Sequence, residues 1–386
     1  MKPPRLLICC NSLAYFINHR LAPALLARGD GFEVHVAASA DINPAALSQL
    51  GLIYEPLVIT RQRLAPLADL GAALAVRRLA RALAPDAVHA ITMKAALVTL
   101  AALPADTDRR LIVTFPGLGR IFSDPRGLWP GLRKRTVIAL LRRFFRRHRK
   151  AVASFENTAD RDFFVARKIV TPENTVILRG TGIDLSRFAP RSAGDVKEAQ
   201  PPTVLFAGRL LRQKGIIEFL GAARSYLRKA RDEGWPPARF AVAGEPDPGN
   251  RDSIDQSKLE GLSAGTGVVL LGHVTDMPSL LQRMDILCLP TRYGEGLPRI
   301  LLEAAASAVP AVVSDVAGCR EIVIDDETGR LVPPGDSRAL LEALHELIDS
   351  PELRLKMGRN ARRRVEDGGF DEETIARAFL ALYRSD

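Results

Sequence analysis

The sequence has few cysteines and no hydrophobic run of membrane-spanning length. Cys9, Cys10, Cys288 and Cys319 are its only cysteines, and their spacing matches no metal site. The apolar run Leu6–Cys10 is too short for a signal-peptide core, so we expect reduced thiols in the cytoplasm. No apolar run approaches the ~20 residues that a transmembrane helix needs. With 47% hydrophobic and 25% charged residues, the composition is that of a globular protein.

The formal net charge of +10 is distributed unevenly along the chain. Residues 1–190 hold 28 Lys and Arg against 14 Asp and Glu, whereas residues 191–386 hold 26 against 30. The positive charge of the first half predicts an anionic partner there, which is a membrane, a nucleic acid or a phosphorylated substrate. Aromatic residues make up only 6% of the chain, and no recognition motif accompanies the charge. We therefore expect no nucleic-acid partner.

Strand-like runs alternate with helix-like segments in two successive series. This alternation predicts parallel sheets with crossover helices, and 386 residues are enough for two domains. A polar, proline-containing stretch at 189–202 separates the series. We expect one α/β domain over 1–190, a second over 200–367, and a helix within 368–386 that packs back on the first domain. The expected strands are 5–10, 33–38, 53–58, 87–90 and 110–114, then 203–207, 239–243, 268–271, 286–289 and 311–314.

The segment Thr291–Glu303 combines two carboxylates with a turn that contains glycine and proline. Glu295 and Glu303 are eight positions apart, and an apolar helix-like run follows Pro298. Proline fits the first turn of a helix, so we expect Glu295 in a loop and Glu303 about a turn and a half into the helix. The amides at the start of this helix predict an anion site. Two carboxylates beside that site suit the hydroxyls of a sugar nucleotide around its diphosphate.

A second candidate segment, Thr203–Gly215, begins as a buried-type strand that ends at Gly208. Arg209 follows at once, and Lys214 precedes a helix. Cations at the carboxyl end of a first strand lie where α/β sheets bind ligands, and both side chains suit a diphosphate. A solvated turn has the same composition, but the glutamates later in the same domain favour a binding site.

These segments resemble family 4 of the retaining, nucleotide-sugar-dependent glycosyltransferases, and the resemblance covers nearly the whole chain. It rests on the order and spacing of motifs, none of which is specific alone. The family implies the GT-B fold, in which two Rossmann-like domains face a central cleft, with the donor mostly on the second domain and the acceptor on the first. Besides the segments above, the resemblance includes Gly182-Ile-Asp-Leu-Ser-Arg-Phe188, Ser314-Asp-Val-Ala-Gly-Cys-Arg-Glu-Ile-Val323 and Gly329-Arg-Leu-Val-Pro-Pro334.

The resemblance implies a donor site that needs no metal. Its cations would bind the diphosphate and stabilise negative charge on the leaving nucleotide. Glu295 would contact the transferred sugar and Glu303 the ribose hydroxyls, although a helix-surface position for Glu303 is the alternative. The implied catalytic residues are Arg209, Lys214 and Glu295, and the implied donor-binding residues are Gly208, Gly296, Leu297 and Glu303.

The first domain supplies candidates for the acceptor side. The segment 11–20 resembles the loop that enters the active cleft in these enzymes, and 88–94 resembles a His-x-x-Thr-x-Lys pattern of lipid-linked-sugar transferases. The segment 114–123 resembles a Gly-Leu-Gly loop, but Pro116 stands where many members carry the histidine expected to be catalytic. A lone histidine at a strand end is equally compatible with a structural role. The acceptor-side candidates are Asn18, His19, His89, Lys94 and Gly117.

The segment 132–150 has the spacing of a basic amphipathic helix. Apolar residues from Val137 to Phe145 recur at helical intervals, and arginines line another face. The pattern is typical of an interfacial membrane segment, to which anionic headgroups contribute on the order of 1 kcal/mol per nearby cation. A core-packing helix with a solvated basic face has the same pattern, and both can hold. The predicted membrane contacts are Arg135, Arg142, Arg143, Arg146 and Arg147.

Together these features predict a retaining glycosyltransferase that moves a sugar from a UDP-sugar to a polyprenyl-diphosphate-linked saccharide. The first-domain segments look most like bacterial enzymes that extend undecaprenyl-diphosphate-linked sugars in surface-polysaccharide or glycan assembly. The expected sugar is an N-acetylhexosamine such as N-acetylgalactosamine, and the expected location is the cytoplasmic face of the inner membrane. The alternatives are a GT-B transferase with a soluble acceptor, a nucleotide-sugar epimerase of related architecture and a non-catalytic sugar-nucleotide sensor.

Overall fold

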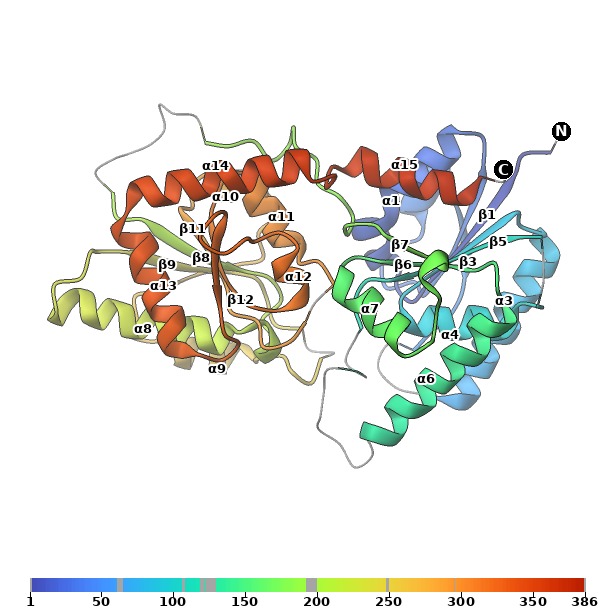
Figure 1. Cartoon of the computed structure of the whole chain (residues 1–386), viewed down its shortest axis with the longest axis horizontal. Helices are drawn as coiled ribbons and strands as arrows, with labels where there is room; N and C mark the ends of the chain where they lie inside the picture. The colour runs from blue at the N-terminus through green and yellow to red at the C-terminus, as the bar shows by residue number, and fades with distance from the viewer. Residues whose placement is uncertain are drawn as a thin grey trace. The chain divides into compact units, whose positions relative to one another are not determined.

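The computed structural model describes residues 2–60, 65–105, 108–118, 122, 130–191, 200–247, 250–294 and 296–384. The chain forms two compact units (Figure 1). Unit 1 comprises Met1–Gly182 and Glu372–Asp386, and unit 2 comprises Ile183–Asp371. Each unit is an α/β structure built on a parallel sheet, which confirms the predicted fold class.

Among the described residues, unit 1 contains a seven-stranded sheet in which every neighbouring pair is parallel. The strand order reverses direction between β1 and β4, so the carboxyl ends of these two strands flank the topological switch point. In spatial order the strands are β3 (Ile53–Pro56), β2 (Glu33–Ala38), β1 (Arg5–Cys10), β4 (Ala87–Ile91), β5 (Arg110–Phe115), β6 (Val152–Phe155) and β7 (Thr175–Ile177).

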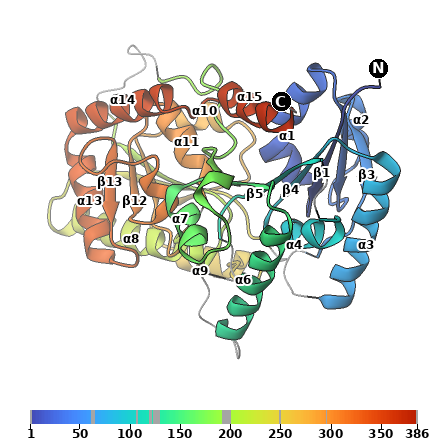
Figure 2. The ribbon, with the colours of Figure 1, turned by 45° about the vertical axis from the view of Figure 1, so that its right-hand side comes forward.

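Helices cover both faces of this sheet, because the strands carry apolar side chains on alternating sides. Leu7 and Cys9 face one buried cluster, and Leu6 and Ile8 face the other. Figure 2 shows three helices of the first cluster, α3, α4 and α6, side by side on one face of the sheet. That cluster includes α3 (Pro66–Leu83), α4 (Met93–Ala102), α6 (Pro130–Arg147) and α7 (Thr158–Ala166); the other includes α1 (Leu13–Gly29), α2 (Ala45–Gln49) and α15 (Glu372–Tyr383).

The chain passes from unit 1 to unit 2 at Gly182/Ile183, earlier than the boundary near residues 190–200 that the sequence suggests. The cause is that Ile183 and Phe188 are buried in the core of unit 2. The N–H of Ile183 also donates to the carbonyl of Phe370, at 2.8 Å. The division therefore falls within the segment that resembles the family's junction signature. The last helix, α15, packs against α1 in unit 1.

In the part of unit 2 that the structure describes, a six-stranded parallel sheet has its switch point between β8 and β11. In spatial order the strands are β10 (Val269–Gly272), β9 (Arg239–Ala243), β8 (Thr203–Ala207), β11 (Ile286–Leu289), β12 (Ala311–Ser314) and β13 (Gly329–Val332). The helices are α8 (Ile216–Asp232), α9 (Gln256–Ser263), α10 (Met277–Leu281), α11 (Arg299–Ala306), α12 (Ala317–Arg320), α13 (Ser337–Asp349) and α14 (Pro351–Asp367).

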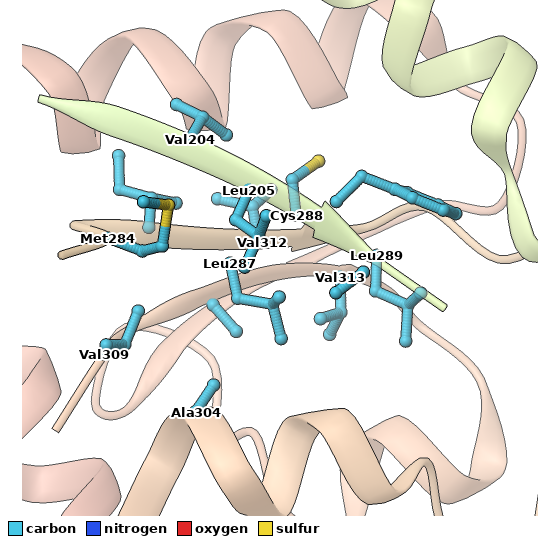
Figure 3. Close-up of a cluster of buried hydrophobic side chains, with 14 of the residues drawn as sticks. Val204, Leu205, Met284, Leu287, Cys288, Leu289, Ala304, Val309, Val312 and Val313 are labelled. Atoms are coloured by element: carbon cyan, nitrogen blue, oxygen red, sulfur yellow. The ribbon is translucent and has the colours of Figure 1, made fainter. Parts of the chain in front are cut away.

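The core of unit 2 fixes the position of α11. Figure 3 shows Ala304 directed at the sheet, on the side where Leu287 and Leu289 of β11 and Val313 of β12 project. Ala304 and Leu287 are fully buried. Since side chains three or four positions apart share a helix face, this packing determines which residues of α11 point away from the sheet.

Candidate functional site

The donor-site candidates that the structure describes lie at the switch point of the unit 2 sheet. Gly208 and Arg209 directly follow β8, and the segment 290–298 follows β11, its neighbour in the sheet. Carboxyl ends of adjacent parallel strands meet at one edge, where open α/β sheets bind their ligands. The motifs, far apart in sequence, are therefore neighbours in space.

Hydrogen bonds join the two loops directly. The carbonyl of Gln213 accepts from the N–H of Arg292 and from the hydroxyl of Thr291, both at 2.9 Å. Thr291 is fully buried. The loop that carries Lys214 is thus tied to the loop that leads into α11, so the two present one rigid surface.

Gly215 permits this contact because it has no side chain. Its φ is +83°, and a Cβ atom there would lie 2.0 Å from the carbonyl oxygen of Pro290. A second glycine, Gly244, follows β9 and is packed as closely. A Cβ atom at Gly244 would lie 1.9 Å from the carbonyl oxygen of Gly208. Both loops therefore require glycine for close backbone approach.

We predict that Gly215→Ala destabilises the protein by about 2 kcal/mol or more. The new Cβ must displace Pro290, and alanine disfavours the positive φ of residue 215. The matched control is Gly221→Ala in α8, where no atom lies within 4 Å of the new Cβ. That substitution should be neutral or stabilising by up to ~1 kcal/mol. Urea unfolding followed by circular dichroism measures both. Equal effects of the two substitutions would contradict the tight contact.

The first turn of α11 faces the site without a side-chain cap. Pro298 occupies the N-cap position, whereas the sequence predicts it one residue later, in the first turn. A proline side chain cannot accept a hydrogen bond, so it does not cap the helix. The helix N-terminus therefore presents amides and a partial positive charge to an incoming anion.

Glu303 lies on α11 with its side chain only 13% exposed. Arg299, one turn earlier, donates from Nε to Oε1 of Glu303 at 3.0 Å. Burial raises the pKa of Glu303 above its ordinary value, and the positive charges of Arg299 and Arg187 oppose that rise. The carboxylate is thus partly desolvated and oriented, as a group that accepts hydrogen bonds from ligand hydroxyls needs to be. This contradicts the alternative of an ordinary surface carboxylate.

Of the two cations, Arg209 is exposed, with 61% of its side chain accessible, and it pairs with Asp247 at 3.0 Å. Lys214 is half-buried in the short 3-10 turn Arg212–Lys214. An exposed ion pair of this kind contributes at most about 1 kcal/mol, so Arg209 can exchange Asp247 for a phosphate at small cost. Glu295 lies outside the described residues; its neighbours Gly296 and Leu297 lie between β11 and α11.

A cavity of about 500 Å³ adjoins this site within unit 2. The ends of β9 and β10 and the start of α9 form it, and the carbonyl of Glu245, a lining residue, accepts from the N–H of Leu210 at 3.1 Å. Sequence reasoning missed it, although Gly244-Glu245-Pro246 after a buried strand was an available signal. The lining residues are Val242, Gly244, Glu245, Gln256, Leu259, Leu270, Leu271 and Gly272.

In unit 1, His89 belongs to the core. It is 1% exposed on β4, and its ring nitrogens contact the hydroxyls of Tyr383 and Thr114, both at 2.7 Å. Burial lowers the pKa of His89 to about 3, so the ring is neutral. These contacts argue against the acceptor-side role predicted for His89 and favour the structural role that the sequence left open.

The sequence resemblance implies that the segment 11–20 is a loop, but most of it is helical, because α1 begins at Leu13. Ser12 caps the helix by accepting from the N–H of Tyr15 at 3.0 Å. Asn18 is exposed and His19 is half-buried, both in the second turn of α1. They remain candidates on a helix that begins at the switch point of the unit 1 sheet.

Lys94 and Gly117 lie at the carboxyl edge of the same sheet. Lys94 is in the first turn of α4 and forms an ion pair with Asp69 of α3, at 2.7 Å. Gly117 follows β5 with a φ of +140°, and the remainder of the Gly-Leu-Gly loop, residues 119–121 and 123, lies outside the described residues. These two candidates therefore follow adjacent strands, β4 and β5.

Helix α6 uses its apolar stripe inside unit 1. Val137, Leu141 and Phe145 are buried in the core. Arg142 is partly buried and donates to the carbonyl of Arg167 at 2.6 Å, at the end of α7. Arg142 is therefore occupied within the protein. The other predicted membrane contacts, Arg135, Arg143, Arg146 and Arg147, are exposed.

Two further features of the described part of the chain bear on ligands. Its His, Cys, Asp and Glu side chains form no group of three or more that could hold a metal ion. None of its helices combines the length and apolar character needed to cross a membrane.

Two family models match the chain. One, described as Glycosyltransferase Family 4, matches residues 17–187, and the other, described as Glycosyl transferases group 1, matches residues 192–364. The two matches follow one another and together cover most of both units.

Curated relatives are similar to parts of the chain. The N,N'-diacetylbacillosaminyl-diphospho-undecaprenol alpha-1,3-N-acetylgalactosaminyltransferase of Campylobacter jejuni is 29% identical over 69% of this chain and 68% of the relative. The capsular polysaccharide biosynthesis glycosyltransferase CapM of Staphylococcus aureus is 31% identical over 47% of this chain and 45% of the relative. Apart from the Campylobacter protein, the chain spans about half the length of the curated relatives it matches.

Solved structures resemble the whole chain. A glycosyltransferase from Rickettsia africae superposes with a TM-score of 0.77 at 14% identity, covering 99% of this chain and 98% of that one. Anabaena Alr3699/HepE in complex with UDP-glucose has a TM-score of 0.75 at 20% identity, with 98% of each chain covered. At these identities the likeness shows the fold, and it confirms the GT-B architecture expected from the sequence.

Proposed function

The chain belongs to family 4 of the retaining glycosyltransferases, and from that membership we propose that it moves a sugar from a UDP-sugar to a polyprenyl-diphosphate-linked saccharide at a membrane. The main support for the proposed donor site is the pair of hydrogen bonds that join the Lys214 loop to the loop leading into α11. It supports a site in which two cations, an uncapped helix N-terminus and the oriented Glu303 surround one switch point.

In this proposal the diphosphate of the donor lies between Arg209, Lys214 and the start of α11. The ribose hydroxyls bond Glu303. The nucleobase occupies the cavity beside Glu245, whose lining combines apolar side chains such as Leu270 with polar ones such as Gln256. Glu295 contacts the transferred sugar, as the family resemblance implies. UDP is the expected nucleotide because Anabaena Alr3699/HepE, of the same fold, is solved with UDP-glucose.

The reaction proceeds with retention at the anomeric carbon. The bond from that carbon to the β-phosphate oxygen breaks, and the acceptor hydroxyl forms a new bond on the same face. The acceptor's proton passes to the departing phosphate oxygen. Arg209 and Lys214 stabilise the negative charge that develops on the leaving diphosphate, where preorganised cations contribute most.

The acceptor half of the proposal rests on unit 1. The Campylobacter jejuni relative is named for transfer of N-acetylgalactosamine to a diphospho-undecaprenol-linked sugar, which supports a lipid-linked acceptor and an N-acetylhexosamine donor. The exposed arginines of α6 supply positive charge suited to an anionic membrane surface. We place the enzyme on the cytoplasmic face of the inner membrane, with Asn18, His19, Lys94 and Gly117 as acceptor-side candidates.

A panel of UDP-sugars tests this function. We expect UDP and one UDP-sugar to stabilise the protein, by roughly 2.7 kcal/mol at a hundred times the dissociation constant. The same sugar should be transferred to a polyprenyl-diphosphate-linked acceptor. Stabilisation by ADP-sugars alone would contradict the nucleotide assignment. Transfer only to water-soluble saccharides would contradict the lipid-linked acceptor, and isomerised donor in the absence of acceptor would indicate an epimerase.

A further inference from the structure

The apolar stripe of α6 cannot enter a bilayer, because Val137, Leu141 and Phe145 pack inside unit 1. Among the described side chains of this helix, only Leu132 and Leu140 are exposed large apolar ones, at 59% and 38%, so the proposed membrane contact of α6 is mainly electrostatic. A purely electrostatic contact is screened at physiological salt, where the Debye length is about 8 Å. Stable attachment of a peripheral protein usually combines cations with apolar side chains that enter the lipid. Unit 1 offers such side chains on another helix.

Helix α3 carries an exposed apolar stripe, which consists of Leu67, Leu70 and Leu74. These side chains are 87%, 58% and 46% exposed and recur at the spacing of one helix face. The opposite face of α3 is buried against the sheet through Ala72, Val76 and Ala80. The helix is therefore apolar on both faces over its first half.

The amount of exposure is unusual within this protein. Among the large apolar side chains that the structure describes, Leu67 is the most exposed and Val58 follows at 76%. Val58 lies on the segment that leads from β3 into α3. The four most exposed large apolar side chains of the described chain are Leu67, Val58, Leu132 of α6 at 59% and Leu70, and all four belong to unit 1. Three of them lie on one connection and the helix it begins, a concentration that marks an interaction surface.

The charge around this stripe is positive. Continuing along the same helix, Arg77, Arg78 and Arg81 are exposed. The only acidic residue of α3 is Asp69, and it forms an ion pair with Lys94. Helix α6, in the same layer, has seven Lys and Arg and no acidic residue (Figure 2). An anionic lipid surface is complementary both to these cations and to the apolar side chains beside them.

We propose that the α3 apolar stripe enters the boundary between headgroups and acyl chains of an anionic bilayer, while Arg77, Arg78, Arg81 and the exposed arginines of α6 contact the headgroups. The inference rests on the proposed membrane-bound acceptor and names the element that reaches it. The ion pair between Asp69 and Lys94 joins the first turns of α3 and α4. The stripe therefore begins at the same carboxyl edge of the sheet as the acceptor-side candidate Lys94.

Co-sedimentation with vesicles of phosphatidylglycerol and phosphatidylethanolamine tests the stripe. At physiological salt we expect the triple substitution Leu67→Gln, Leu70→Gln, Leu74→Gln to reduce the partition coefficient by about tenfold or more, since each buried leucine contributes to transfer. The control Leu355→Gln changes a 51%-exposed leucine of α14 in unit 2 and should leave binding unchanged. Arg143→Glu with Arg147→Glu should weaken binding chiefly at low salt.

A label locates the insertion independently. The four native cysteines are all buried, so Leu67→Cys introduces an accessible thiol for an environment-sensitive fluorophore. Anionic vesicles should shift its emission to the blue, and the same label at Leu355→Cys should not respond. Equal responses at both positions, or an unchanged partition coefficient of the triple variant, would overturn the proposal. So would a concentration-dependent dimer of the parent that the triple variant abolishes, because the stripe would then bind a second copy.

The donor site supplies the readout that separates this proposal from the proposed function. The triple variant should keep full stabilisation by UDP and full transfer to a water-soluble acceptor analogue, and lose only transfer to vesicle-bound acceptor. If UDP did not stabilise the parent protein, that result would instead count against the glycosyltransferase site in unit 2.

Discussion

Replacing Lys214 with alanine is expected to lower kcat by about 10²–10³-fold, the range found when one preorganised group at a developing oxyanion is removed. Lys214 lies in the turn whose neighbouring carbonyl, that of Gln213, binds the loop leading into α11. The turn holds the backbone of Lys214 in place before the donor binds, so little reorganisation of the loop is needed as the diphosphate departs. Because the charge that Lys214 meets grows in the transition state, kcat should fall more than the donor KM rises.

The control for this substitution lies in the same turn. Arg212 is an exposed cation two positions before Lys214, and Arg212→Ala removes the same charge from the same 3-10 turn. If the effect of Lys214→Ala were only a change in overall charge, both variants would lose activity equally. Steady-state kinetics with a UDP-sugar separate the outcomes, and full activity of Lys214→Ala would refute the site.

The fold of unit 2 was predictable because four of its described strands are buried on both faces. Strands β8, β9, β11 and β12 lie within the residue ranges that the sequence predicts. A parallel strand covered by helices on both faces reads as a continuous apolar run, which periodicity identifies easily when polar residues bound it. The prediction that the cations after β8 and the glutamates near β11 belong to one site rests on the parallel arrangement, since the carboxyl ends of parallel strands meet at one edge.

Interactions between distant segments were not predictable from one sequence. The contact between His89 and Tyr383 joins positions 294 apart, and it turns a candidate acceptor residue into a core residue. The spacing of α6 predicts an amphipathic helix correctly, but only the fold shows that its apolar face packs inward and that Arg142 is occupied. The start of α1, in contrast, carried a local signal, because Ser12 is a preferred N-cap residue.

A buried ion pair in unit 1 illustrates how much such a distant contact contributes. Arg20 of α1 and Glu156, which follows β6, are 2% and 7% exposed, and Nη2 of Arg20 donates to Oε1 of Glu156 at 2.5 Å. Arg20 also donates to the carbonyl of Gly180 at 3.0 Å. The guanidinium therefore connects α1, the end of β6 and the segment that leaves unit 1, and removing it would take the paired cation away from a buried carboxylate.

We predict that Arg20→Met destabilises unit 1 by about 3–5 kcal/mol, the usual effect of leaving one partner of a buried pair uncompensated. For a unit of this size, that corresponds to a fall in Tm on the order of 10 °C. Adding Glu156→Gln should recover more than half of the loss, because the buried side chain is then neutral, while the carbonyl of Gly180 still lacks its donor. Arg384→Ala, which breaks the exposed pair with Asp30 in the same unit, should cost less than about 1 kcal/mol. Scanning calorimetry of the four proteins decides the matter. If the double variant were no more stable than Arg20→Met, the loss would come from packing, and the buried charge would not be its cause.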